Sequence, residues 1–142
     1  MNMPPLKAFA DSVECFEHYR KVYCSGPIPT FDGIMVRFRK EDFLHCFFES
    51  SNRDDQKDTF STRRAERIDW IKAALQDPKA ELFAGWDRKR KIHDRDRRVC
   101  VVSGDYVVII ALTDKDKAYI ITAFVIDDPR VLESIKRSPK WK

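Results

Sequence analysis

An arginine continues the apolar stripe of the helix that the sequence predicts over residues 63–77. At 100° per residue this stripe consists of Ile68, Ile71 and Leu75, and Arg64 lies one turn closer to the N-terminus on the same line. A guanidinium in line with core residues needs an acceptor, because burying an unpaired charge is costly. The acceptor is either a carboxylate inside the protein or a phosphate in a cleft. In the second case this helix forms the floor of an anion site.

Other side chains with suitable chemistry accompany Arg64. Arg67 lies at the edge of the same stripe. His45 borders the apolar face of a second predicted helix, residues 40–50, where its pKa can sit near neutrality and a cleft can expose it. A purely structural histidine is the alternative. Arg97 and Arg98 introduce a predicted strand, so one of them should point towards a sheet face that a helix covers.

A hydroxyl completes this set of candidates. Thr122 lies in the last predicted strand, on the side shared by Ile120 and Phe124, and needs a hydrogen-bond partner among these apolar side chains. That partner is a neighbouring strand or a ligand. A histidine that moves protons, arginines that neutralise charge and a hydroxyl that holds a phosphate oxygen suit phosphoryl chemistry on RNA. No Asp, Glu or His cluster has metal-ligand spacing, so we expect neither a metal nor another cofactor.

Positive charge is concentrated between residues 88 and 98, although the net charge of the chain is only +4. This basic segment carries seven Lys or Arg against two Asp. Such a patch commonly meets a polyanion, and the alternative is a solvated hairpin loop that is charged for solubility. We expect phosphate contacts from Arg88, Lys89, Arg90, Lys91, His93 and Arg97.

The composition favours one folded domain. The chain has 142 residues, of which 43% are hydrophobic and 12% aromatic, enough for a core of its own. No apolar run reaches the length of a membrane span, and the N-terminus lacks the charged and apolar regions of a signal peptide. We therefore expect a cytoplasmic protein without a membrane partner. Its cysteines show no CxxC spacing and are interpreted as buried small hydrophobic residues: Cys15, Cys24, Cys46 and Cys100.

The order of the predicted elements favours an α+β fold. Helices are expected over residues 6–23, 40–50 and 63–77, the last capped by Ser61 or Thr62, and residues 34–38 form a short strand or extended lead-in. Strands follow over residues 80–86, 99–103, 106–112 and 118–126, with a turn at Gly104-Asp105. The last two strands are apolar on both faces and should be central. The expected architecture is N-terminal helices packed on a four-stranded antiparallel sheet, with a short C-terminal helix.

Short sequence words in a fixed order resemble a known family of nucleases. The words are Phe43-Leu44-His45-Cys46-Phe47, Arg64-Ala65-Glu66-Arg67-Ile68-Asp69-Trp70-Ile71, Gly85-Trp86-Asp87, Arg97-Arg98-Val99, Tyr106-Val107-Val108 and Ile121-Thr122-Ala123-Phe124. Their order is similar to that in the phage- and mobile-element-borne nucleases of the barnase–EndoU–colicin–RelE-like (BECR) fold. The likeness begins near residue 31 and leaves residues 1–30 as an N-terminal helix and turn.

That resemblance implies a single nuclease-like domain and a metal-independent endoribonuclease, often a toxin, that cleaves RNA by attack of the 2′-OH and leaves a cyclic phosphate. Its site residues would be His45, Arg64, Arg67, Arg98 and Thr122. We expect structured RNA such as tRNA as the substrate and an inhibitor or antitoxin protein as a further partner. The alternatives are a non-catalytic RNA- or DNA-binding accessory protein and a degenerate nuclease fold used for protein binding.

Overall fold

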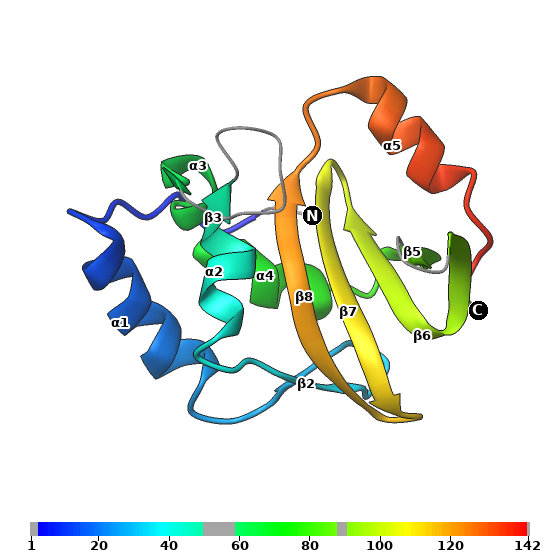
Figure 1. Ribbon diagram of the computed structural model, residues 1–142, viewed down its shortest axis with the longest axis horizontal. Coiled ribbons are helices and arrows are strands. Elements are labelled where there is room, and N and C mark those ends of the chain that lie inside the picture. Colours follow the sequence, from blue (N-terminus) through cyan, green and yellow to red (C-terminus); the bar gives the residue numbers. More distant parts are fainter. Residues whose placement is uncertain (1–2, 50–58, 88–90, 142) are drawn as a thin grey trace.

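The computed structural model describes residues 3–49, 59–87 and 91–141, apart from the side chains of residues 86–87 and 93–97 (Figure 1). Its helices are α1 (Ser12–Tyr23), α2 (Asp42–Phe47), α3 (Thr62–Ala65), α4 (Ile68–Leu75) and α5 (Pro129–Lys136). Four short strands lie in the first half: β1 (Ile28–Pro29), β2 (Met35–Arg37), β3 (Phe48–Glu49) and β4 (Thr59–Phe60). Four longer strands follow: β5 (Glu81–Asp87), β6 (Ile92–Ser103), β7 (Tyr106–Asp114) and β8 (Lys117–Val125).

Six strands form one mixed sheet in the order β1-β2-β8-β7-β6-β5, and β3 pairs with β4 separately. Strands β5 to β8 make the predicted antiparallel meander, and the α+β class is confirmed. The prediction of a four-stranded sheet is wrong, because β2 adds to β8 in parallel and β1 adds to β2 antiparallel. Both added strands are two or three residues long, so the sequence signals only an extended segment there.

The sheet separates two apolar clusters. The larger joins α1, α2 and α4 to one face, which we call the helix face, through residues such as Tyr19 and Ile68. The smaller lies on the opposite face, the α5 face, where Leu132 of α5 packs on it. Val107 and Val108, neighbours in β7, are both completely buried, as predicted for a central strand. Figure 1 shows α5 well separated from α1 and α2.

The single helix predicted over residues 63–77 is wrong: α3 and α4 are separate, with Glu66 and Arg67 between them. In a continuous helix the Arg67 amide would bond the carbonyl of Arg63. Here the Arg67 guanidinium donates to that carbonyl at 2.8 Å, and the amide turns to Arg64 at 3.2 Å. The Glu66 carbonyl accepts instead from the amide of Lys7, at 2.9 Å. These replacement bonds satisfy the backbone groups that the break releases.

The break decides the direction of Arg64. Ser61 caps α3 by accepting from the Arg64 amide at 3.2 Å, as one of the two predicted caps. Ile68 and Leu75, on α4, are completely buried in the helix-face cluster. Arg64 therefore lies on a different helix from Ile68 and Leu75, and its side chain points towards Thr122 of β8.

The basic segment is a strand over much of its length, not a loop. Strand β6 begins at Ile92 and pairs with β5 across a register shift between Ala84 and Gly85. Alternating Asp and Arg give this part of β6 no apolar face, so the sequence carries no strand signal there. At Gly85 an added Cβ would lie 2.7 Å from the Cβ of Arg98. The close approach of β5 and β6 therefore requires glycine at this position.

No disulfide joins the four cysteines within the described residues. Cys15, Cys46 and Cys100 are buried as predicted, whereas Cys24 is only half-buried. Burial raises the pKa of Cys15 and of Cys100 to about 12. None of the helices in the described residues is long and apolar enough to cross a membrane.

Candidate anion-binding site

Arg64 reaches from α3 to β8 and is held there by neutral groups. Its Nη1 donates to Thr122 Oγ1 at 3.3 Å and to the backbone oxygen of His45 at 3.4 Å. The Thr122 hydroxyl donates to the same carbonyl at 2.8 Å. A carboxylate oxygen of Glu49 lies 3.8 Å from Arg64 Nε, but the Glu49 side chain is 54% exposed. The acceptors that Arg64 needs are thus a hydroxyl and a carbonyl rather than a buried carboxylate.

A pocket of about 90 Å³ opens beside this network, with room for a few water molecules or a group the size of a phosphate. Arg67, 18% exposed, enters it from the break between α3 and α4, and its guanidinium lies 5.0 Å from the centre of the Trp70 ring. The Arg67 Nε is buried and has no hydrogen-bond partner among the described residues. The pocket is lined by Glu49, Arg63, Arg64, Arg67, Tyr106, Phe124, Val125 and Asp127.

Tyr106 forms a buried wall of this arginine pocket and is only 3% exposed. Its ring meets Trp70 edge-on, with the ring centres 5.5 Å apart. Burial raises the pKa of Tyr106 well above its ordinary value, and the charges of Arg64 and Arg67 only partly oppose that shift. The phenol therefore keeps its proton at neutral pH, as a donor to an anion must.

The three arginines of the pocket differ in how they are compensated. Arg63 forms a two-point ion pair with Asp127, which lowers the pKa of that carboxyl. Arg67 donates to a carboxylate oxygen of Glu66 at 2.9 Å. Arg64 has no carboxylate within hydrogen-bond distance among the described residues. The positive charge of Arg64 is therefore the least compensated of the three and the best suited to attract an anionic ligand.

Thr122 reaches this network because β8 is irregular. Ile110 pairs with Ile120, whereas Ile109 pairs with Thr122, so Ile121 is one extra residue in β8. Ile120 belongs to the helix-face cluster, and Ile109 packs on the α5 face. The expectation that Thr122 shares a side with Ile120 is therefore wrong. The extra residue reverses the alternation, which sequence pattern alone assumes to be regular.

Of the five predicted catalytic residues only Arg64 and Arg67 line the pocket; Thr122 is joined to it through its hydrogen bond with Arg64, and His45 and Arg98 contribute no side chain. His45 contributes its backbone carbonyl to the Arg64 network, and its side chain is exposed on α2. Arg98 is half-buried in β6 and pairs with Ala111 of β7, so it lies two strands away from Thr122. The structure thus brings together Arg64, Arg67 and Thr122 and leaves the other two outside.

The predicted phosphate contacts of the basic segment are mostly untested by the structure. Lys91 is exposed at the start of β6, with φ 55°. Arg88, Lys89 and Arg90 lie outside the described residues, as do the side chains of His93 and Arg97.

Sequence reasoning missed four polar residues of the pocket: Glu49, Arg63, Tyr106 and Asp127. For Arg63, the one sequence signal that could have indicated a place in the pocket is its position next to Arg64. Glu49 and Asp127 sit at the end of β3 and just after β8, where no local pattern marks a carboxylate. Tyr106 opens an apolar strand, so its pattern indicates only core.

Among models of known protein families, curated proteins and solved structures, none matches this chain. The function must therefore be inferred from the arrangement of the side chains. Three guanidinium groups around a small pocket, with a phenol that stays protonated, can bind a phosphate and neutralise negative charge that develops on it. The site is an arginine-lined pocket whose charge suits an anionic ligand.

Proposed function

We propose that this protein is a metal-independent endoribonuclease that cleaves structured RNA such as tRNA, with the arginine pocket as the site of the scissile phosphate. One observation carries the proposal: Arg64 is 17% exposed, borders the pocket and is held by neutral acceptors. A guanidinium in that setting gains from an anionic ligand that the protein itself does not supply. Arg64 and Thr122 belong to the sequence motifs whose order resembles that in BECR nucleases, and this resemblance supports the same function.

The pocket residues suggest how the reaction would run. The Glu49 carboxylate takes the proton of the 2′-OH, whose oxygen forms a bond to the adjacent phosphorus. The bond from phosphorus to the 5′-oxygen breaks, and that oxygen takes a proton from the imidazolium form of His45, which becomes the neutral imidazole. The exposed side chain of His45 has no hydrogen-bond partner among the described residues, so it can turn towards the pocket. The products are a 2′,3′-cyclic phosphate and a 5′-hydroxyl.

Charge stabilisation belongs to the arginines in this proposal. Arg64 and Arg67 face the non-bridging oxygens, which gain negative charge as the phosphorus becomes five-coordinate. Tyr106 donates a hydrogen bond from the wall of the pocket. Thr122 keeps the Arg64 guanidinium in place through the bond that they share.

Incubation of the purified chain with total RNA and with tRNA in excess EDTA tests this function. Cleavage should persist in EDTA, because the sequence has no cluster with metal-ligand spacing. Glu49→Gln and His45→Ala should each reduce cleavage by about 100-fold or more, within the usual range for general acid–base groups. Glu14→Gln, a change of the same kind on the exposed face of α1, is the matched control. Cleavage that EDTA abolishes and magnesium restores would contradict the mechanism.

A non-catalytic RNA-binding protein is the second candidate, because the His45 imidazole does not line the pocket. This candidate predicts RNA binding that depends on Arg64, with no strand cleavage and no effect of His45→Ala. The same incubation, analysed for both binding and cleavage, separates the two candidates.

A further inference from the structure

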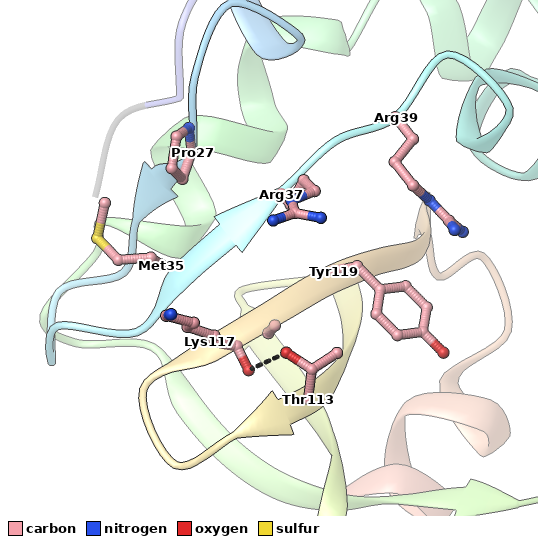
Figure 2. A pocket seen from close by; sticks show the side chains of 8 residues that line it. Pro27, Met35, Arg37, Arg39, Thr113, Lys117 and Tyr119 are labelled. Atoms are coloured by element: carbon pink, nitrogen blue, oxygen red, sulfur yellow. Dashed lines mark hydrogen bonds between the residues drawn. The ribbon is translucent and has the colours of Figure 1, made fainter.

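A second groove, of about 480 Å³, lies between β2 and β8. Figure 2 shows Arg37 and Arg39 on one side of this β2–β8 groove, with Tyr119 and Lys117 on the other. Val36 is buried in the helix-face cluster, whereas its neighbour Arg37 is exposed. Since alternate residues of a strand point to opposite faces, the groove opens on the α5 face of the sheet.

Two of the three cations that line the groove, Arg37 and Lys117, have no compensating acid among the described residues. None of its lining residues is acidic, and they are Pro27, Met35, Arg37, Arg39, Thr113, Lys117, Ala118 and Tyr119. Within the described part of the chain, the side chains of Arg37 and Lys117 make no ion pair. Their register partners are Tyr119 and Met35 respectively, so charged and apolar side chains alternate across the groove. An anionic ligand with a flat apolar part fits this lining.

An aromatic platform is fixed in the same groove. The guanidinium of Arg39 lies 5.2 Å from the centre of the Tyr119 ring. Arg39 is held from behind by Asp42, whose side chain is 2% exposed and accepts from Nε and Nη2 at 3.1 and 3.0 Å. An arginine and a tyrosine in cation–π contact are side chains of the kind on which nucleic-acid bases stack.

Strand β8 connects this platform to the arginine pocket. Tyr119 and Phe124 are five residues apart, a separation that normally places side chains on opposite faces. The extra residue in β8 corrects this, because Tyr119 pairs with Ala111 and Phe124 with Val107, four residues apart in β7. Both rings therefore lie on the α5 face, about 13 Å apart at roughly 3.3 Å for each of the four residues of β7 between their partners. Phe124 lines the arginine pocket, so a ligand that reaches both places must be extended.

We propose that the β2–β8 groove binds a single-stranded segment of the RNA, with a base against the Arg39–Tyr119 platform and phosphates at Arg37 and Lys117. From there the strand follows β8 to the arginine pocket. This inference rests on the proposed function, since it takes RNA as the ligand. It adds the substrate class: the cleaved bond lies in or next to an unpaired loop, where bases are free to stack on side chains.

Binding of a labelled, uncleavable RNA to the full chain tests the groove. The probe is a 2′-O-methyl RNA of about 12 nucleotides, within the range of known single-strand sites, followed by fluorescence anisotropy. The double variant Arg37→Ala/Lys117→Ala should bind about tenfold or more weakly. It should also lower the slope of log K against log salt by about 1.4, since each lost phosphate contact on a single strand accounts for roughly 0.7. Lys72→Ala/Lys79→Ala, a matched removal of two exposed lysines outside the groove, is the control.

Two variants of Tyr119 separate stacking from charge. Tyr119→Leu should weaken binding by roughly 5- to 100-fold without a change of salt slope, whereas Tyr119→Phe keeps the ring and should bind as the wild type. Melting temperatures close to that of the wild type establish that both variants are folded.

The outcomes for the groove and for catalysis are distinct. Cleavage of RNA together with groove variants that bind like the lysine control would overturn the groove and keep the nuclease. Binding that depends on Arg37, Lys117 and Tyr119 without any cleavage would keep the groove and overturn the nuclease. Preference for a duplex of the same sequence over the single strand would overturn the single-strand assignment.

Discussion

Replacing Arg64 by leucine separates a ligand-binding role from a structural one. This variant lacks two long hydrogen bonds of the wild type, those from the Arg64 guanidinium to Thr122 and to the carbonyl of His45. The bond between Thr122 and that carbonyl, at 2.8 Å, remains, so neither group is left without a partner. Among the described residues, the one carboxylate that loses a nearby charge is Glu49, which is more than half exposed and can be hydrated.

The expected change in stability is small. Two hydrogen bonds at 3.3 and 3.4 Å are at the weak end of the usual net contribution of about 0.5–1.5 kcal/mol each. Leucine recovers part of that loss, since the guanidinium lies 5.7 Å from the Phe124 ring, in surroundings that suit an apolar side chain. The net change should stay within about 1 kcal/mol, or about 3 °C in Tm for a chain of this size. A buried pair with a carboxylate would instead cost about 3–5 kcal/mol on losing one partner.

Cleavage should respond far more strongly. Loss of a preorganised charge at the transition state typically lowers kcat by about 100-fold or more. Arg64→Lys should also be poor, because an ammonium cannot hold Thr122 and a phosphate with the planar fork of a guanidinium. The assay is a thermal melt beside a single-turnover cleavage rate, with Arg20→Leu, an exposed arginine of α1 in a surface pair, as control. A fall of about 10 °C or more in Tm, or cleavage within twofold of the wild type, would refute the phosphate-site assignment.

Three other variants test separate parts of the structure. Gly85→Ala should lower the free energy of unfolding by about 1–3 kcal/mol, since the added Cβ would lie 2.7 Å from that of Arg98. Gly26→Ala, whose added Cβ would have no other atom within 4 Å, is the control and should be nearly neutral in the same thermal melt. Burial raises the pKa of the Cys100 thiol from 9.0 to about 12, so the folded state holds the thiol proton more tightly and loses stability as pH rises through that range. The drop in Tm between pH 9 and 12 should therefore be smaller for Cys100→Ala than for the wild type. An equal drop would contradict this. Tyr106→Phe should keep the fold and slow single-turnover cleavage by about 100-fold, the lower end of the range for one lost donor to a developing charge. An unchanged rate would remove Tyr106 from the proposed mechanism.

Local patterns allowed the sequence to predict those parts of the fold that local chemistry determines. Largely apolar runs identified β7 and β8 as central strands, and each has a neighbouring strand on both sides. Strand β7 is largely buried on both faces, whereas β8 is buried on one face and half-buried on the other. The turn between β6 and β7 depends on Gly104, which adopts φ +63° as a two-residue hairpin loop of that kind requires. Ser61 provides the cap of α3 through its own hydroxyl. In each case a few neighbouring residues suffice to specify the geometry.

The arginine pocket could not be assembled in the same way, because its members come from distant parts of the chain. Asp127 meets Arg63 only after β8 has been placed against α3, and Glu49 approaches Arg64 only through the short strand β3. The extra residue at Ile121 leaves no mark in a run of aliphatic side chains, yet it decides which face Thr122 takes. Such contacts depend on strand register, which the sequence pattern does not specify within an apolar run.

Arg64 shows how a candidate site residue can be selected on an incomplete premise. Helical periodicity placed it on the stripe of Ile68 and Leu75, so the sequence required an acceptor, either a carboxylate inside the protein or a phosphate in a cleft. In the structure α3 ends before Arg67, whose guanidinium takes the carbonyl that a continuous helix would have used, so Arg64 does not share the core-facing stripe of α4. Arg64 is then directed to the edge of the sheet, where a hydroxyl and a carbonyl hold it beside a pocket. Arg67 thus has two tasks, since it stabilises the break that orients Arg64 and lines the same pocket. Replacing Arg67 should therefore reduce both stability and function, whereas replacing Arg64 should reduce function alone.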